Sequence, residues 1–260
     1  MNDAEYRLAG GVNYSKLKHM RASPLHYRHS VEAGDPPGLA QKLAMFRAVH
    51  TLVLEPSQWE LEYAIYSGRR DKRTKAYQAF LSLNEGKTVL TPDEYSQAMD
   101  ISAAVLDHPW VVELLEDGDT YTEVPMFWED PDAGECKGKA DILHSSPSRG
   151  IILADLKTFS TTDGQAIARQ GGLNGWHLQA AHYLAGAQAM FGDLPASAFL
   201  IVVEAKAPHD VTVAQWSPDT LRAAEAERRG LLMRLRECVS AERWPGRPRM
   251  QTIEVPPYLL

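Results

Sequence analysis

Cysteine is scarce in this sequence, and its scarcity excludes several classes of protein. Cys136 and Cys238 are the only two, and neither belongs to a CxxC or CxxH motif. A disulfide framework, a four-cysteine zinc site and a cysteine-ligated iron–sulfur cluster all need more cysteines at closer spacing. We therefore expect none of these three.

Long apolar runs and an excess of basic charge are lacking as well. No run approaches the ~20 apolar residues that a membrane-spanning helix needs, and the first residues lack the basic-then-apolar pattern of a secretion signal. We expect a cytoplasmic protein with no membrane partner. The net charge of −7 argues against a protein that coats nucleic acid indiscriminately, although it allows a local basic groove.

The composition is that of a globular protein. Of its 260 residues, 44% are hydrophobic and 23% charged, so the chain can bury a proper core. We expect a single domain over 1–260, with a mainly helical part at 1–118, an α/β core at 119–217, and a C-terminal helix and tail at 218–260. The predicted fold class is α/β, with a mixed central β-sheet flanked by helices and an N-terminal helical elaboration.

Helices in the first part are predicted from apolar spacing and from prolines at their ends. Three stretches qualify: 13–30, capped near Asn13 or Ser15 and ended by Pro24; 38–55, ended before Pro56; and most of 69–116. Within the last stretch, Thr91 predicts an N-cap, Pro92 the first helical position and Glu94 a capping box.

The character of the sequence changes near residue 120. Strands are predicted at 120–130, 135–146 and 149–160, joined by turn-forming stretches. A glycine-rich loop at 171–175 is expected to lead into a helix at 176–191. The remaining elements are predicted to be a buried strand at 197–206, a strand at 210–216 and an amphipathic helix at 217–238.

One acid-x-Lys tripeptide stands out by its context. The chain holds four copies, and only DLK, Asp155 to Lys157, ends a strongly apolar strand and follows a second strand that ends in an acid, Asp141. The offset of the two aspartates fits a hairpin that brings both carboxylates to one place. Asp155 and Lys157, two residues apart on one strand, then point to the same face.

Two carboxylates held this close repel each other unless a cation lies between them or one takes up a proton. Oxygen ligands of this kind suit Mg²⁺ or Mn²⁺. Such a metal polarises a phosphodiester and lowers the pKa of a bound water, and a nearby ammonium stabilises developing negative charge. The pattern therefore indicates phosphodiester hydrolysis. The alternative is that Asp155 and Lys157 form an ion pair at a sheet edge.

Several motifs resemble one enzyme family. GKADIL and IILADLKT, which contain Asp141 and Asp155, resemble the core of the PD-(D/E)xK nuclease superfamily. QAAHY, with Gln179 and Tyr183, is similar to the QxxxY motif of its lambda-exonuclease and RecB-like branch. VHTLVLEP, which contains His50, resembles a helix of phage and prophage exonuclease VIII (RecE) proteins. Segments near both ends resemble the same RecE-type family, so the similarity covers nearly the whole chain.

The resemblance assigns roles to the residues of the core. It implies that Asp141 and Asp155 bind the metal with the Leu156 carbonyl, and that Lys157 positions the attacking water or stabilises the transition state. It implies a further metal ligand at His50. The alternative for His50 is a core histidine, because its helix is otherwise apolar.

Three more residues are candidates for the active site, and each also has an explanation without a role in catalysis. Related nucleases place an acid that binds metal through water near Glu123, which is otherwise an exposed strand residue. Gln179 and Tyr183 are four apart on one predicted helix, so they share a face and could hold the scissile phosphate; the alternative is a tyrosine in the core.

A local run of positive charge at 68–75 is the candidate DNA groove. A solvated helix face is its alternative. The DNA-binding candidates are Arg69, Arg70, Lys72, Arg73 and Lys75 in this run, together with Thr158 and Ser160 after the lysine of DLK.

The family implies a function for the whole chain. It would be a Mg²⁺- or Mn²⁺-dependent exodeoxyribonuclease that degrades double-stranded DNA from its ends, 5′→3′, in phage-type recombination. The implied partners are a RecT-like single-strand annealing protein and further copies of the chain in a ring-like homo-oligomer. Two alternatives stay open: a RecB-like defence or repair nuclease acting on single strands or internally, and a non-catalytic DNA-binding module of the same fold.

Overall fold

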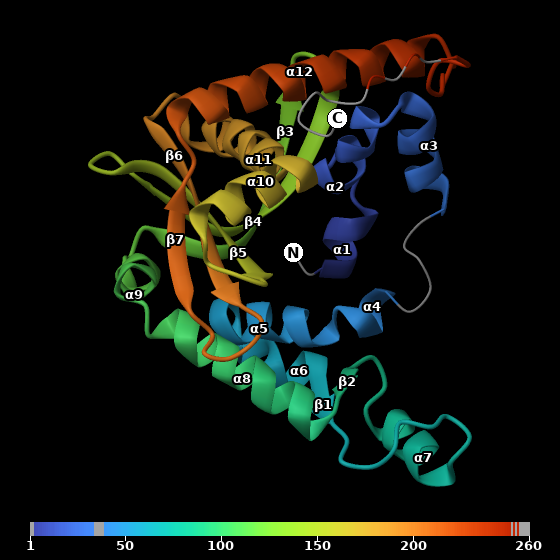
Figure 1. The fold of residues 1–260 in the computed structure, drawn as a ribbon, viewed down its shortest axis with the longest axis vertical. Helices are drawn as coiled ribbons and strands as arrows, with labels where there is room; N and C mark the ends of the chain where they lie inside the picture. The colour runs from blue at the N-terminus through green and yellow to red at the C-terminus, as the bar shows by residue number, and fades with distance from the viewer. Residues whose placement is uncertain (1–2, 34–38, 251, 253, 255–260) are drawn as a thin grey trace.

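The centre of the protein is a five-stranded mixed sheet (Figure 1). A computed structural model describes residues 3–33, 39–250, 252 and 254. The strand order is β3-β4-β5-β6-β7, and only β5 and β6 run parallel. The strands are β3 (Thr120–Asp130), β4 (Gly134–Ser146), β5 (Gly150–Phe159), β6 (Ala196–Glu204) and β7 (Val211–Gln215). The predicted mixed sheet is confirmed.

Helices cover both faces of the sheet, and the side chains on both faces of the central strand β5 are therefore buried. Ile152, Ala154 and Leu156 pack toward one helical layer, and Ile151 and Leu153 pack toward the other. The first layer is α5 (Ala44–Leu54), α8 (Pro92–Leu106) and α9 (Pro109–Glu116); the second is α10 (Gly164–Asn174), α11 (Trp176–Phe191) and α12 (Pro218–Ser240).

The N-terminal segment differs from the single helix predicted for 13–30. The Asn13 side chain does cap α2 (Tyr14–Leu17), but the chain then forms a 3-10 turn, η1 (Lys18–Arg21). Pro24 begins α3 (Pro24–Ala33) and does not end a helix. Proline has no N–H, and the first turn of a helix is where that loss matters least, so Pro24 can open a helix. A short helix, α1 (Asp3–Leu8), precedes these elements.

The predicted helices at 38–55 and 69–116 are interrupted. The first divides at Leu43 into α4 (Leu39–Lys42) and α5. In the second, residues 69–74 are not helical and α7 (Lys75–Leu83) is followed by a strand that sequence reasoning missed. That strand, β2 (Thr88–Leu90), pairs in parallel with β1 (Tyr63–Ile65). Two short helical segments, η2 (Pro56–Gln58) and α6 (Trp59–Glu62), precede β1 in the chain. The capping box of Thr91 and Glu94 is confirmed.

The glycines at 171–175 do not form the predicted loop. Gly171 and Gly172 lie inside α10, and only Gly175 takes the left-handed conformation, with φ 73°, that separates α10 from α11. A Cβ atom at Gly171 would lie 2.9 Å from the Trp216 ring. The glycine therefore serves a close approach of α10 to the sheet, which a single sequence does not distinguish from a loop.

α11 lies equally close to β4. A Cβ atom at Gly138 would lie 2.8 Å from Cδ1 of Tyr183, and one at Gly186 would lie 2.8 Å from the Trp128 ring. Both glycines therefore let aromatic rings fill the space between the helix and the sheet. Since Tyr183 is a candidate site residue, Gly138 helps to fix its position over β4.

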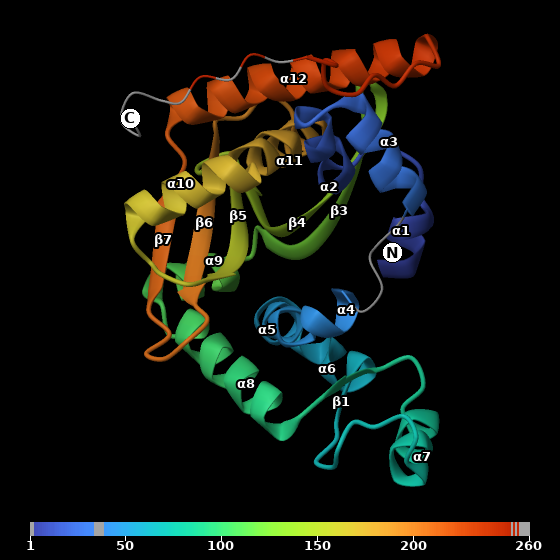
Figure 2. The ribbon, with the colours of Figure 1, turned by 45° about the vertical axis from the view of Figure 1, so that its right-hand side comes forward.

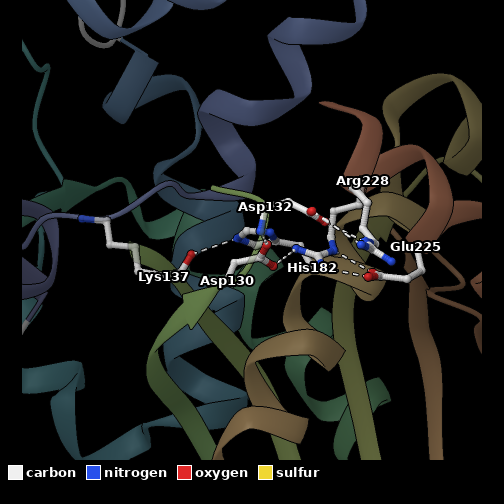
Figure 3. A network of polar contacts seen from close by, with 7 residues as sticks. Asp130, Asp132, Lys137, His182, Glu225 and Arg228 are labelled. Carbon is white, nitrogen blue, oxygen red and sulfur yellow. Dashed lines mark hydrogen bonds and ion pairs between the residues drawn. The ribbon is translucent and has the colours of Figure 1, made fainter. Parts of the chain in front are cut away.

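Buried polar contacts fasten α11 and α12 to the sheet (Figure 3). Arg228 and Asp130 are both nearly inaccessible and form an ion pair of 2.7 Å, and Arg228 also pairs with Glu225. Such charges are tolerated because they are paired. His182 is fully buried, and its Nε2 lies 3.1 Å from the Lys137 carbonyl oxygen. Burial lowers the pKa of His182 to about 4.

Within the described ranges, no helix combines the length and the apolar character that a membrane crossing requires.

The burial of His182 predicts a loss of stability in mild acid. A histidine whose folded pKa lies below its unfolded value of about 6.5 contributes stability that is present above pH 6.5 and lost as the pH falls toward 4. Between pH 7 and pH 5 this group alone should cost about 2 kcal/mol. Denaturant unfolding of wild type and His182→Gln at both pH values measures it. Between pH 7 and pH 5 the free energy of unfolding should fall by about 2 kcal/mol less in the variant than in wild type. An equal fall in both proteins would contradict the lowered pKa of His182.

The contact between Gly138 and Tyr183 predicts that Gly138→Ala is destabilising by about 1–3 kcal/mol, because the added methyl overlaps a partly buried ring. Gly230→Ala is the matched control. Gly230 is exposed within α12 and has open space at its Cβ position, so alanine should stabilise it by about 0.5–1 kcal/mol. Urea denaturation of both variants tests the pair, and a neutral Gly138→Ala would refute the packing argument.

Candidate active site

Three acidic residues lie side by side on three adjacent strands. The pairs Thr122↔Ile142 and Val124↔Ala140 place Glu123 of β3 opposite Asp141 of β4. The β4–β5 ladder ends at Ile142↔Ala154, so Asp141 and Asp155 occupy the next opposed positions. The predicted hairpin therefore brings the two aspartates together, and β3 adds a third carboxylate in the same row. We call Glu123, Asp141 and Asp155 the acid row.

The strands change face at the acid row. Ala140 packs under α11, whereas Ile142, two residues further, packs toward α5 and α8. Regular alternation would leave both on one face. Glu123, opposite this point, has φ 52°, a left-handed conformation that is uncommon for a residue other than glycine. Such conformations cluster at functional sites. Periodicity gave no sign of this distortion.

α5 brings His50 to the acid row. The imidazole Nδ1 lies 3.8 Å from Asp141 Oδ2, and one possible ligand atom from each of His50, Glu123 and Asp141 lies within 4.8 Å of the other two. Burial lowers the pKa of His50 to about 4, the charge of Lys157 contributes, and a hydrogen bond with the Leu156 backbone opposes the shift. His50 is therefore neutral at pH 7, as a metal-binding histidine must be.

Leu156 connects the two aspartates and His50 through its backbone. Its N–H donates a 2.8 Å hydrogen bond to Asp141 Oδ2, and the His50 side chain also forms a hydrogen bond with the Leu156 backbone. The Leu156 side chain is buried in the core between the sheet and α5. Of the predicted ligands, His50, Glu123 and Asp141 form one cluster beside the Leu156 backbone, whereas Asp155 does not belong to that cluster.

Asp155 is held from two sides. Its Oδ2 forms an ion pair with Lys157 Nζ, and its Oδ1 accepts a 2.9 Å hydrogen bond from Gln179 Nε2 of α11. Asp155 and Lys157 share a face, as their spacing predicted. They are not at a sheet edge, because β5 lies between β4 and β6. Burial lowers the pKa of Lys157, but the Asp155 and Asp141 carboxylates outweigh it and hold the pKa above the usual lysine value.

Gln179 and Tyr183 do share one face of α11. A hydrogen bond joins their side chains, and burial followed by the charges of Asp155 and Asp141 raises the pKa of Tyr183 above its usual range. The phenol is therefore a neutral donor near the carboxylates. The alternative of a tyrosine in the core holds in part, since its ring also packs against the buried residues under α11.

Sequence reasoning missed one charged residue of the site. Lys139, two residues before Asp141, forms a 2.6 Å ion pair with Glu123. The signal was present in the letters GKAD, where a lysine precedes the acid by one strand period. Lys139 balances the outermost carboxylate of the acid row.

The basic run lies far from the acid row. Figures 1 and 2 place α7 at the end of the molecule opposite α12, beyond α5 and α8. Arg70 forms a two-pronged ion pair with Glu94, with hydrogen bonds of 2.8 and 2.9 Å, and Arg73 pairs with Asp71. Arg69, Lys72 and Lys75 are exposed.

The two polar residues after Lys157 have different surroundings. Ser160 is exposed, at the end of β5. The Thr158 hydroxyl is buried, and its oxygen has no hydrogen-bond partner among the described residues.

The chemistry of the donor set fits a divalent cation. Burial, followed by the charge of Asp155, raises the pKa of Asp141 well above its usual value. A cation among these carboxylates would remove that penalty. The carboxylate and carbonyl oxygens suit Mg²⁺ and Mn²⁺, and the neutral imidazole adds a nitrogen of the kind that softer divalent metals prefer. His50, Glu123, Asp141 and the Leu156 carbonyl are the groups that could hold the ion, with Asp155 beside them.

Comparisons with known proteins concern the fold and the family of the chain. Among solved structures, the chain is similar to a Eubacterium rectale protein named "Putative exonuclease", with a TM-score of 0.66 and 12% identity over 98% of this chain and 95% of that one. At that identity the likeness shows the fold. The structure named SSO0001 matches at a TM-score of only 0.33, with 15% identity over 80% of this chain and 89% of that one. No curated protein matches.

A family model matches most of the sequence. The "PDDEXK-like domain of unknown function (DUF3799)" matches residues 13–253, which include every residue of the acid row together with His50, Lys157 and Gln179. The five-stranded mixed sheet with helices on both faces is the fold expected from the resemblance to the PD-(D/E)xK superfamily. The chain belongs to this family of PDDEXK-like domains.

Proposed function

We propose that the protein is a divalent-metal-dependent nuclease that hydrolyses the phosphodiester bonds of DNA. The observation that carries the proposal is the acid row with Lys157 beside it, in a chain that belongs to a PDDEXK-like family. A bound Mg²⁺ or Mn²⁺ would supply a Lewis acid and a water of lowered pKa. A purely structural site would have no physical reason to bring these carboxylates together.

The chain's own residues have separable roles in this proposal. Asp141 and Asp155, with His50 and the Leu156 carbonyl, would hold the ion, and Glu123 would complete the set directly or through water. Lys157 is kept charged by Asp155, so it offers a proton donor and a fixed positive charge to the phosphate. Gln179 orients Asp155 through its hydrogen bond.

Tyr183 and Gln179 also form the helix side of the site. Both lie on α11, which is fastened to β4 through His182 and to β3 through close packing at Gly186. A neutral tyrosine hydroxyl can donate a hydrogen bond to a phosphate oxygen without adding charge. We assign Gln179 and Tyr183 to the positioning of the scissile phosphate.

The substrate ends, the polarity, the pathway and the partners are proposed from the resemblance to the RecE-type family. We propose attack at the ends of double-stranded DNA with 5′→3′ polarity, in phage-type recombination with a RecT-like annealing partner and a ring-shaped homo-oligomer. The name of the Eubacterium rectale protein supports an exonuclease. In this proposal the exposed Arg69, Lys72 and Lys75 contact duplex away from the acid row, while Ser160 and Thr158 lie near the scissile strand.

Asp155→Ala and Lys157→Ala should each lower the rate of DNA hydrolysis by about 100-fold or more, because Lys157 would stabilise charge at the reacting phosphate and Asp155 keeps Lys157 charged. Linear duplex labelled at the 5′ or 3′ end and covalently closed circles are incubated with Mg²⁺ or with EDTA. We expect degradation of linear DNA in Mg²⁺ only, with loss of the 5′ label first.

The control variant is Asp193→Ala, which removes a carboxylate from an exposed loop after α11 and should retain full activity. Cleavage of closed circles would contradict the exonuclease proposal and favour internal nicking. Activity in EDTA, or undiminished activity in both site variants, would contradict the site assignment.

A further inference from the structure

Lys139 holds the outer end of the acid row. In the β3–β4 ladder Pro125 lies opposite Lys139, so the nearest carboxylate of the row, Glu123, is its diagonal neighbour on β3. Lys139 Nζ lies 2.6 Å from Glu123 Oε2. Only 24% of the Lys139 side chain and 17% of the Glu123 side chain are exposed. The contact is therefore a partly buried ion pair, which solvent screens less than a surface pair.

The carboxylate that Lys139 holds also belongs to the candidate metal site. One possible ligand atom of Glu123 lies within 4.8 Å of ligand atoms of His50 and Asp141. A divalent ion bound directly to Glu123 and the ammonium group of Lys139 would therefore compete for the same carboxylate. Strand geometry keeps the competitor in place, because both residues are fixed in one ladder.

A second lysine holds the other end of the row. Lys157 forms an ion pair with Asp155, as Lys139 does with Glu123. Among the residues that the structure describes, no lysine or arginine forms an ion pair with Asp141, the middle carboxylate. The position at Asp141 is therefore the one in the row that a metal ion can take without displacing a lysine.

The charges of the row limit the number of ions that it can hold. Three carboxylates carry three negative charges and two lysines return two positive charges, so one negative charge remains. One divalent ion leaves a single positive charge, which the single negative charge of a phosphodiester balances. Two-metal sites hold their ions about 4 Å apart. A second ion here would leave three positive charges confined to that space, and their repulsion would be strong.

We propose that the site holds one divalent ion, and that Lys139 sets this number by occupying the carboxylate that a second ion would need. The inference rests on the proposed nuclease function and deepens it. Lys139 is a positioning residue, because it acts through Glu123 and does not touch the reacting phosphate. Glu123, held by Lys139, then reaches the bound ion through water.

Counting bound Mn²⁺ tests the inference without DNA and without hydrolysis. Protein freed of metal with EDTA and then dialysed is titrated with Mn²⁺, and the electron paramagnetic resonance signal of the free ion gives the number bound per chain. The count at the acid row is the difference between each protein and the same protein carrying Asp141→Asn. We expect one ion for wild type and two for Lys139→Gln, in which Glu123 can bind a second ion directly.

Two controls separate this local effect from a general change of charge. Arg234→Gln removes a positive charge from an exposed position on α12 and should bind one ion, as wild type does. Adding Glu123→Gln to Lys139→Gln removes the carboxylate that the second ion needs, so the count should return from two to one. Circular dichroism checks the fold of every variant, and Lys139→Met replaces Lys139→Gln if the latter does not fold.

Two ions at the acid row of wild type would overturn the inference and leave the nuclease function standing. One ion in the folded Lys139 variant would overturn it as well, because Lys139 would then not limit the number. A wild-type protein in which Asp141→Asn abolishes no Mn²⁺ binding would instead contradict the metal site, and with it the proposed function. The three failures therefore give different counts or appear in different proteins.

Discussion

Repulsion between carboxylates is the constraint on which the rest of the structure depends. Glu123, Asp141 and Asp155 are fixed on adjacent strands, where the backbone ladder sets their separation and prevents them from moving apart. Lys139 and Lys157 each neutralise one end of the row. Asp141, in the middle, is left with a raised pKa. The fold therefore holds a site whose central charge is compensated only when a cation binds or a proton is taken up.

The surrounding elements keep this arrangement rigid. The β3–β4–β5 meander sets the register, α5 delivers His50, and α11 delivers Gln179. Close approach of α11 to β4 needs a glycine at position 138, and the buried Arg228–Asp130 ion pair fastens α12 outside α11. Preorganised groups of this kind stabilise developing charge without reorganisation during reaction.

The parts of the site that follow from strand period could be predicted from the sequence, and those that depend on tertiary packing could not. A two-residue period placed Asp155 and Lys157 on one face, and the hairpin offset brought Asp141 opposite Asp155. Capping chemistry located the start of α8 at Thr91. In contrast, the need for a glycine at position 171 comes from its close contact with the Trp216 ring, and the role of Pro24 depends on which side of it the helix forms. The ion pair of Arg70 with Glu94 joins residues far apart in sequence, so a charge run alone could not reveal it.

The central claim is that the acid row exists to hold a divalent cation, and anomalous diffraction from crystals containing Mn²⁺ tests it most directly. The account predicts an anomalous peak within coordination distance of Asp141, with His50, the Leu156 carbonyl and Asp155 as further ligands and Glu123 bound directly or through water. Crystals of Asp141→Asn under the same conditions should lose the peak. Full occupancy of Mn²⁺ elsewhere on the chain, with none at the acid row, would contradict the account.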